Sequence, residues 1–506
     1  MMAESDFLDY IRKQAEEGLK LWDSPSVSIG IIKDGRVVLC EGFGNRDVEQ
    51  KLPATGKSLY QTGSCSKAFT SALVAILVDQ GKLSWDDPII NYLPNVRFFE
   101  DYTTSNLTMR DILSHRSGLP RHEYAWYGTD FTKEELIFNL RYLEPNKPIR
   151  TKFQYNNYGY ILAGYIVEKI TGKSWEECVE EYILKPLGMS RTNMFIDAIK
   201  ADPDHAEPYD RPDASGENMK GMSKIPFFQM NEEDYTLRKG SPAGPAAAVN
   251  SCAEEMLKWV SLHLNHGEYD GKRIISEKSM NELHKPNMLL PYIFDMPQEE
   301  MKHPSYGMGW FVESYRGYTL VEHGGNLDGF SAHTGFIPEL NLGVVAYTNM
   351  NVSNLQDALA HEIYDYYIGA KNGNWVKRYH EYQTNQWKKR DSITTLYAGE
   401  KAENTAPSHP LEAYTGTYTR NGYTPVTIRL EDGKLYLKFI DADTELRHYH
   451  YDTFLTSNLM GGGEISPGLP VSFQTADFRS NIETLVMPLC FEDGAAPIRF
   501  KKQQEA

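Results

Sequence analysis

Hydrophobic and polar residues alternate in two regions that flank a long helical stretch of the chain. The first region, SVSIGIIKDGRVV (26–38), alternates on both sides of an Asp-Gly pair, which predicts a β-hairpin. Alternation returns in YGMGWFVESYRGYTLVEHGG (306–325) and FSAHTGFIPELNLGVVAYTNMN (330–351), whereas helical patterns dominate from about 64 to 290. Strands at both ends of a region with helices between them predict one antiparallel sheet flanked by helices, together with a helical subdomain.

The C-terminal part of the chain has a different pattern. From about 371 to 410 the sequence is polar apart from one helical segment, which predicts a helical linker. From 411 to 506 short strand patterns follow one another, and Asn421-Gly422 and Asp432-Gly433 supply hairpin turns. We therefore predict an α/β (α+β) domain over 1–370, a linker over 371–410, and a small antiparallel, barrel-like β domain over 411–506.

Composition and charge remove several classes of function. The chain of 506 residues is 41% hydrophobic, as expected of a globular protein, and it carries a formal net charge of −17. This negative field repels phosphate backbones, so we expect no nucleic-acid partner. The five cysteines are odd in number and form no CxxC, so neither a disulfide framework nor a zinc site is indicated.

The N-terminal segment gives information about the cellular location of the protein. MMAESDFLDYIRKQAEEGLKLW is a charged amphipathic helix without the apolar segment of a signal peptide, and no run of 18 apolar residues occurs in the chain. We therefore expect a cytoplasmic protein that does not span a membrane.

Common nucleotide and metal motifs fail on inspection. TGKS occurs at 55–58 and 171–174, but Lys51 and Val167 occupy the place of the first P-loop glycine. The chain has no HExxH, GxSxG or GxGxxG, and its fourteen histidines lack metal-ligand spacing. The sequence therefore indicates neither a metal nor a cofactor.

One short motif does carry chemistry, the S-x-x-K formed by residues 64–67. Gly63 precedes Ser64 and an apolar helix follows, so Ser64 is expected at a helix N-terminus, where free N–H groups favour negative charge. Lys67 lies one turn later on the same face. A lysine beside apolar surface loses solvation and can then accept a proton from a serine nucleophile. The alternative is that Ser64 only caps the helix while Lys67 extends to solvent.

Two further segments favour the catalytic interpretation. Tyr155-Asn156-Asn157, a Y-x-N, stands just ahead of an apolar helical pattern. His323-Gly324-Gly325 stands at the end of a predicted strand, and its paired glycines allow a substrate backbone to approach the strand edge.

Together these segments resemble the β-lactamase-related serine hydrolases, which include penicillin-binding D,D-peptidases, class C β-lactamases, D-aminopeptidases and related esterases. The resemblance covers about 20–370, and residues 411–506 are similar to the lipocalin-like domain appended to some peptidase members. The landmarks in family order are SVSIGIIKDGRVV, SCSK, ILSHRSGLP, YNN with YGYILAGYIVE, PAGPAAAV, and HGG with GFSAHTGFIP.

The resemblance implies a role for each matching residue. Ser64 would be the acylated nucleophile, and Lys67 and Tyr155 would share the general-base and general-acid work. Asn157 would hydrogen-bond the substrate amide or the lysine. The N–H groups of Ser64 and Asn326 would form the oxyanion hole.

The third motif departs from the pattern of β-lactamases and penicillin-binding proteins, which carry K-T-G there. That lysine supplies a cation for the penicillin carboxylate, whereas His323 has an ordinary pKa of about 6.5 and is largely neutral at pH 7. A strong carboxylate site is therefore not expected, and H-x-G is the pattern of D-aminopeptidase-like and esterase-like members. The alternative for His323 is a purely structural role.

Other residues receive plainer interpretations. We expect His115 to be a structural turn residue and Cys65 to pack in the interior. Tyr124, Trp126 and Tyr127 could line a substrate cleft or pack within a surface loop, and the sequence does not decide between these two possibilities.

The sequence thus predicts a serine hydrolase that acts through an acyl-enzyme on amide or ester bonds of small peptides or related compounds, D-amino-acid compounds among them. A carboxylesterase or a weak β-lactamase is the alternative within this class, and a non-catalytic binding or assembly protein is the alternative outside it. We expect residues 411–506 to shape access to the site, with the polar segment 457–468 reaching toward it, or to mediate assembly into a homo-oligomer.

Overall fold

The first domain is organised around one large antiparallel sheet. In the described residues this sheet has nine strands in the order β10-β11-β12-β13-β14-β15-β1-β2-β3. β1 pairs with β15, so segments from both ends of the domain meet in the middle of the sheet, as the sequence predicted. The strands are β1 (Ser26–Lys33), β2 (Arg36–Asp47), β3 (Leu52–Pro53), β10 (Met288–Leu289), β11 (Met301–Tyr306), β12 (Phe311–Tyr315), β13 (Tyr318–Leu327), β14 (Phe330–Ile337) and β15 (Leu342–Thr348).

The chain is represented by a computed structural model. It describes residues 3–211, 221–227, 241–291, 299–371, 373–388, 398–456, 468–475, 481–490, 492 and 494–504. Most of the polar segment 457–468 therefore lies outside the described residues. No helix in the described part of the chain has the length and apolar character needed to cross a membrane.

The β1–β2 hairpin follows from its turn residues. Asp34 and Gly35 have φ values of 52° and 73°, the left-handed pair that a tight turn between twisted strands requires. Glycine adopts this conformation without strain and aspartate tolerates it better than most residues. The Asp-Gly pair thus accounts for the hairpin that the alternating pattern predicted.

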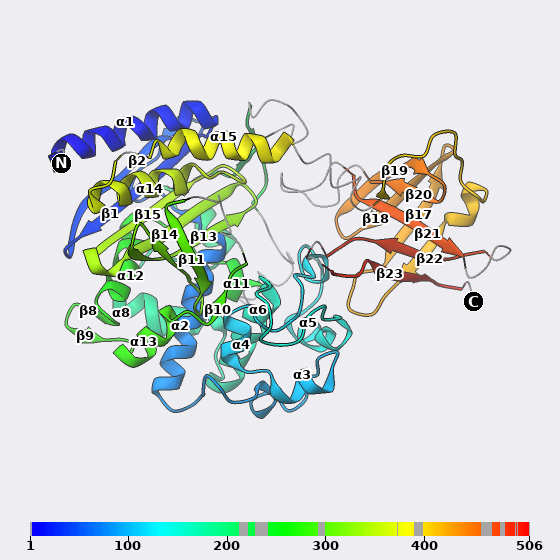
Figure 1. Cartoon of the computed structure of the whole chain (residues 1–506), viewed down its shortest axis with the longest axis horizontal. Helices are drawn as coiled ribbons and strands as arrows, with labels where there is room; N and C mark the ends of the chain where they lie inside the picture. The colour runs from blue at the N-terminus through cyan, green and yellow to red at the C-terminus, as the bar shows by residue number, and fades with distance from the viewer. Residues whose placement is uncertain are drawn as a thin grey trace.

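Three helices cover one face of the sheet (Figure 1). They are α1 (Glu4–Trp22), α14 (Leu355–Ile368) and α15 (Trp375–Lys388). Phe7, Trp22, Tyr364 and Trp375 are buried together between these helices and the sheet. α15 lies in the segment predicted as a linker, and its Trp375 and Tyr379 are nevertheless completely buried.

The opposite face carries the larger core and the helical subdomain (Figure 1). α2 is central there, because every residue from Ser66 to Leu77 is buried and the helix contacts α6, α11 and α13. The helices of this side are α2 (Ser66–Asp79), α3 (Asp101–Asn106), α4 (Met109–Leu113), α5 (Lys133–Asn139), α6 (Asn157–Thr171), α7 (Trp175–Val179), α8 (Lys185–Leu187), α9 (Ile196–Ala201), α11 (Gly244–Ala247), α12 (Ala253–Leu264) and α13 (Glu277–His284).

Short elements connect these helices. The small strands are β4 (Tyr60–Gln61), β5 (Tyr209–Asp210), β6 (Ser223–Lys224), β7 (Asn250–Ser251), β8 (Glu268–Tyr269) and β9 (Lys272–Arg273). Two short helical turns matter for the site, namely η1 (Gly63–Cys65) and η3 (Glu123–Ala125).

The C-terminal part forms a closed antiparallel barrel of eight strands among the described residues, which confirms the predicted barrel-like β domain. The apolar side chains of Tyr418, Leu437, Phe473 and Phe500 are buried in it. Its strands are β16 (Gly416–Thr419), β17 (Val426–Glu431), β18 (Lys434–Phe439), β19 (Ala442–His450), β20 (Thr453–Leu455), β21 (Pro470–Thr475), β22 (Ile482–Met487) and β23 (Ile498–Lys502).

The barrel meets the first domain on the side of the helical subdomain. In Figure 1, strands β22 and β23 lie nearest the cyan segment that carries α5. The ring of Tyr124 lies 6.0 Å from the ring of Phe439, and Arg420 approaches Glu144 at 3.9 Å. Loop 119–128 is therefore placed between the barrel and the start of α6.

Candidate active site

Ser64 lies in the turn η1 that leads directly into α2. Gly63 has φ of +51°, and a Cβ on it would lie 2.9 Å from the backbone N of Asn326. Glycine is therefore required at this position both for its backbone conformation and for the close approach of β13. Ser64 is partly exposed, whereas the Ser66 hydroxyl is buried and hydrogen-bonds Gly63 O at 2.7 Å and Val249 N at 2.9 Å. Only the Ser64 hydroxyl of this pair is available for chemistry.

Lys67 is completely buried beside Ser64. Its Nζ lies 2.9 Å from Ser64 Oγ and donates to Ala246 O at 3.0 Å. Burial holds the pKa of Lys67 well below its usual range, while nearby Glu123 raises it and Arg121 lowers it. The interpretation in which Lys67 extends to solvent does not hold. A neutral amine at this distance can accept the serine proton.

Tyr155 completes the inner group. Its ring centroid lies 4.8 Å from Lys67 Nζ, and its side chain hydrogen-bonds the Ser64 side chain. Burial raises the pKa of Tyr155 above its ordinary value, so the phenol keeps its proton at neutral pH. Burial thus shifts the two pKa values in opposite directions, which favours a neutral amine on Lys67 and a neutral phenol on Tyr155.

The Y-x-N segment is positioned by the cap of α6. The side chain of Asn156 caps the helix by accepting from Gly159 N, and its backbone N donates to His115 Nδ1 at 3.0 Å. His115 has φ of +55°, and its ring packs 4.3 Å from the ring of Tyr155, which agrees with the structural role expected for it. Asn157 is the first residue of α6, and its Nδ2 donates to Glu123 Oε1 at 2.7 Å.

Strand β13 brings the third motif against the serine. β12 pairs with β13 only as far as Phe311 opposite Glu322, so within the described residues His323 to Leu327 pair with β14 alone. This local edge faces η1, because a Cβ on Gly325 would lie 1.9 Å from Thr62 O and 3.1 Å from Ser64 N. The backbone N atoms of Ser64 and Asn326 both lie beside this contact between η1 and β13, an arrangement compatible with an oxyanion hole.

His323 is a buried, neutral residue in this arrangement. Its Nδ1 donates to Gly324 O at 2.6 Å, and its Nε2 accepts from the Tyr306 hydroxyl at 2.8 Å. Burial, with a smaller contribution from nearby Lys67, lowers the pKa of His323 to about 3. His323 therefore supplies no cation at neutral pH, as the sequence predicted, and both of its ring nitrogens have partners within the protein.

Three residues of this region had no role in the sequence interpretation. Tyr306 hydrogen-bonds His323, and the guanidinium of Arg121 lies 5.4 Å from the centroid of the Tyr155 ring. Arg121 Nε also lies 3.1 Å from Glu123 Oε2. The only sequence signal for Arg121 and Glu123 was a pair of charges immediately after SGLP, and such charges are usually solvated surface.

The structure also shows how deeply the aromatic residues of loop 119–128 are buried. Tyr124 and Trp126 are 0% and 3% exposed, so they pack in the interior and do not line an open cleft. Tyr127 is half-buried. Cys65 is buried as expected, and its Sγ donates to His323 O at 3.2 Å.

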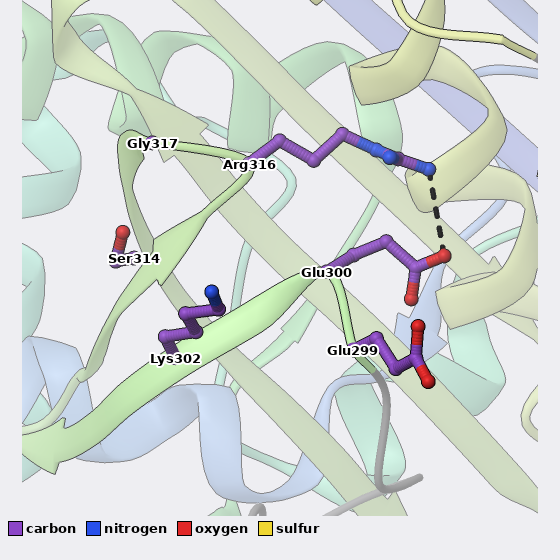
Figure 2. A pocket seen from close by; sticks show the side chains of 6 residues that line it. All are labelled: Glu299, Glu300, Lys302, Ser314, Arg316 and Gly317. Atoms are coloured by element: carbon purple, nitrogen blue, oxygen red, sulfur yellow. Dashed lines mark ion pairs between the residues drawn. The ribbon is translucent and has the colours of Figure 1, made fainter.

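A separate hollow of about 480 Å³ lies at the other end of β11, near Met301 (Figure 2). Figure 2 shows Glu300 and Arg316 joined by an ion pair there, and Glu300 also pairs with Arg378 at 2.9 Å. Because Tyr306, which contacts His323, is at the opposite end of this strand, the hollow is not part of the Ser64 site. Its lining consists of Glu299, Glu300, Lys302, Ser314, Arg316 and Gly317.

Across the part of the chain that the structure describes, no group of three or more His, Cys, Asp or Glu side chains could hold a metal ion. The five cysteines are all free thiols.

Two family models match this chain. The Beta-lactamase model matches residues 13–366, and a model described as a domain of unknown function (DUF3471) matches residues 400–502. Among curated proteins, the chain is 27% identical over 466 residues to Unguisins hydrolase ungD' of Aspergillus campestris, which covers 87% of this chain and 81% of that protein.

Solved structures with the same fold were also found. The octameric penicillin-binding protein homologue from Pyrococcus abyssi matches with a TM-score of 0.62 and 23% identity, covering 99% of this chain and 100% of that one. D-amino acid amidase from Ochrobactrum anthropi SV3, complexed with L-phenylalanine amide, matches with a TM-score of 0.56 and 21% identity, covering 75% of this chain and 99% of that one.

Proposed function

Because the chain belongs to the Beta-lactamase family and is a serine hydrolase, we propose that Ser64 is its nucleophile and is acylated by the substrate. The observation that carries this assignment is the buried Lys67 amine, 2.9 Å from a partly exposed serine hydroxyl. A lysine with a lowered pKa provides a neutral base where a serine needs one. The fold, the turn and the base thus support one chemical role for Ser64.

Acylation would proceed by a balanced proton transfer. The neutral Lys67 amine accepts the Ser64 proton as Ser64 Oγ bonds to the substrate carbonyl carbon, whose π electron pair moves to the carbonyl oxygen. That oxyanion is stabilised by the N–H groups of Ser64 and Asn326, each worth about 10²–10³ in rate at comparable sites. The C–N or C–O bond then breaks, and the leaving group takes a proton from Tyr155, which Lys67 reprotonates.

Deacylation would use the same groups in reverse. A water molecule takes the place of the leaving group. Its proton passes through Tyr155 to Lys67 as its oxygen attacks the acyl carbon. The bond between the acyl carbon and Ser64 Oγ then breaks. Ser64 Oγ regains its proton, and the second product leaves the site. In this scheme Asn157, Gly324 and Gly325 bind the substrate, and His323 positions β13 without itself titrating.

We propose that the substrates are small amides, namely amino-acid amides and short peptides, with D-residues accepted. The support comes from the named relatives, which include a hydrolase and a D-amino acid amidase. The limited exposure of Lys67, Tyr155 and His323, 8% or less, also supports small substrates. An ester substrate passes through the same tetrahedral intermediate, so an esterase remains the alternative to be distinguished.

A substrate panel tests this assignment. We expect D-aminoacyl p-nitroanilides to be cleaved with kcat/KM no more than about tenfold below that of their L-counterparts, a difference of at most about 1.4 kcal/mol in transition-state binding. The measurement compares D- and L-alanine p-nitroanilide with p-nitrophenyl acetate. Hydrolysis of the ester alone would establish an esterase, and no labelling of the wild-type chain by a fluorophosphonate would establish a non-catalytic protein.

β-Lactams should be poor substrates. Because His323 is neutral, the penicillin carboxylate lacks the charge-assisted hydrogen bond that contributes about 1.5–3 kcal/mol, and we expect nitrocefin kcat/KM about 10–100-fold below that of the same site with a cation at this position. Since the pKa of His323 is about 3, lowering the pH from 8 to 5 should not charge it or improve nitrocefin turnover. Efficient nitrocefin hydrolysis at pH 8 would contradict the assignment, and His323→Lys tests for a gain.

The sequence placed a domain boundary at about 370, but α15 packs on the first domain, so we propose that the linker follows α15 and that the barrel domain begins near 411. We further propose a cytoplasmic location and a homo-oligomeric state. The free thiols fit a reducing compartment. Assembly is suggested by the octameric homologue. Sedimentation of the purified chain measures the oligomeric state directly.

A further inference from the structure

The segment 119–125 presents two charged side chains to the Ser64 site. Glu123 accepts from Asn157 Nδ2 at 2.7 Å through one carboxylate oxygen and lies 3.1 Å from Arg121 Nε through the other. The side chain of Glu123 is 17% exposed and that of Arg121 is 43% exposed. A carboxylate therefore stands beside the first residue of α6, in the same group of side chains as Lys67 and Tyr155.

The other side of the same segment is held by the barrel. His122 Nε2 lies 3.0 Å from Glu144 O, and because a carbonyl only accepts, this nitrogen carries the proton. His122 Nδ1 therefore accepts from the Tyr423 hydroxyl at 2.5 Å. The barrel also contributes Glu492, whose Oε1 accepts from Arg121 N at 2.9 Å.

This contact is buried in the protein interior. His122, Tyr423 and Cys490 are 2%, 4% and 3% exposed, and Cys490 Sγ lies 3.3 Å from His122 Nδ1. His122 also has φ of +44°, a conformation that a non-glycine residue keeps only when its surroundings hold it. The barrel thus fixes the backbone between the two charged residues and not merely the outer surface of the loop.

We propose that Glu123 binds the free ammonium group of a short substrate and that the barrel, through Tyr423 and His122, holds Glu123 in place for this task. Glu123 would be a specificity-determining residue and Tyr423 a positioning residue. The inference rests on the proposed function and names the substrate class of that site, amino-acid amides and peptides with a free amino terminus.

The chemistry of the acyl group supports this choice. In an amino-acid amide the ammonium nitrogen is two bonds from the carbonyl carbon that Ser64 attacks, so it lies close to Ser64 and within reach of the side chains around it, Asn157 among them. Glu123 hydrogen-bonds Asn157, and a carboxylate has about four lone-pair sites, so it can accept from a substrate as well as from Asn157 and Arg121. An N-acetylated substrate offers no ammonium to this carboxylate.

The experiment measures preference for a free amine. For alanine p-nitroanilide of the preferred configuration and its N-acetyl derivative, we expect the wild-type ratio of kcat/KM to be about 10–100 in favour of the free amine. Glu123→Gln should reduce this ratio to near 1, and Glu123→Asp should retain part of it. An unchanged ratio in Glu123→Gln overturns the assignment of Glu123.

The role of the barrel is tested by Tyr423→Phe, which removes only the hydroxyl group that donates a hydrogen bond to His122 Nδ1. We expect KM for the free amine to rise and the ratio to fall about 3–10-fold, because only the free amine uses Glu123. Tyr418→Phe is the matched control, because Tyr418 donates to Tyr414 O inside the barrel and does not touch the loop. A ratio that is unchanged in Tyr423→Phe, or that falls equally in Tyr418→Phe, overturns the positioning role.

A second measurement keeps the two proposals distinguishable. Alaninamide and N-acetylalaninamide are compared as protectants of Ser64 against a fluorophosphonate in all variants. If Ser64 is labelled and alaninamide slows this labelling no more than N-acetylalaninamide does, the ammonium site is overturned and the proposed function stands. Absence of labelling in the wild type overturns the proposed function itself.

Discussion

Replacing Ser64 with alanine will reduce kcat for the best substrate by about 10⁴-fold or more, because a nucleophile that forms a covalent intermediate has no substitute within reach. The structure singles out this hydroxyl, since Ser64 is partly exposed and lies 2.9 Å from Lys67 Nζ. The covalent prediction is equally direct. Intact-mass measurement after a fluorophosphonate or a slow ester should show one adduct, and peptide mapping should place it on Ser64.

Ser66→Ala is the matched control for this experiment. The Ser66 hydroxyl is bound between Gly63 O and Val249 N, so its loss should lower the free energy of unfolding by about 1–3 kcal/mol. Labelling at Ser64 should persist in this variant. An adduct on Ser66 in the wild type, or full turnover by Ser64→Ala, would refute the assignment of the nucleophile.

Replacing Lys67 with methionine will reduce kcat/KM by about 10²–10⁴-fold, the usual contribution of a general base. Methionine keeps the volume and removes only the amine. Because the neutral amine is the active form, wild-type kcat/KM should rise with pH as Lys67 loses its proton and then level off. Burial places this rise well below the ordinary lysine pKa, and the pH profile of Lys67→Met should lack it.

The same substitution has a predictable effect on stability. The pKa of Lys67 is lower in the folded chain than in the unfolded chain, so the unfolded chain binds more protons and wild-type stability falls as pH falls from about 10.4. Lys67→Met should therefore be more stable than the wild type, and the difference should grow from pH 9 to pH 6. Urea denaturation at both values measures it.

Lys57→Met serves as the control for both effects. The Lys57 side chain is 63% exposed and pairs with Glu254 at 3.6 Å, so neither activity nor the pH dependence of stability should change. If Lys67→Met retained the wild-type pH profile, Tyr155 would be the base instead. That result would assign the role of proton acceptor to Tyr155 and leave the assignment of Ser64 as nucleophile unchanged.

The contacts of loop 119–125 connect the small barrel to this chemistry. Its backbone lies between Tyr423 and Glu492 on one side and Asn157 and Tyr155 on the other. Arg121 and Glu123 also change the Lys67 pKa in opposite directions. Substitutions at the barrel contact that move Arg121 or Glu123 would therefore change the pKa of Lys67, although no barrel side chain is needed for bond breaking.

The sequence by itself determined much of the fold, because the signals involved are local. Alternation around Asp34-Gly35 and the two further strand stretches identified the sheet, since the pleat has a period of two residues and a tight turn needs positive φ. The β-hairpin patterns of the barrel succeeded for the same reason. The S-x-x-K and Y-x-N segments could also be located, because each combines a chemical residue type with the start of a helix. The H-x-G segment was found by its residue types alone, since it lies inside β13, which continues to Leu327, and not at the strand end that the sequence predicted.

Only the tertiary structure decided what surrounds those segments. Burial of Lys67, the neutral state of His323 and the packing of Tyr124 on Phe439 depend on which side chains close around each residue. The contact of His122 with Tyr423 joins residues 301 positions apart. Periodicity along the chain carries no information about such pairs, because the free energy of desolvation and the charge state of a side chain are set by neighbours in space.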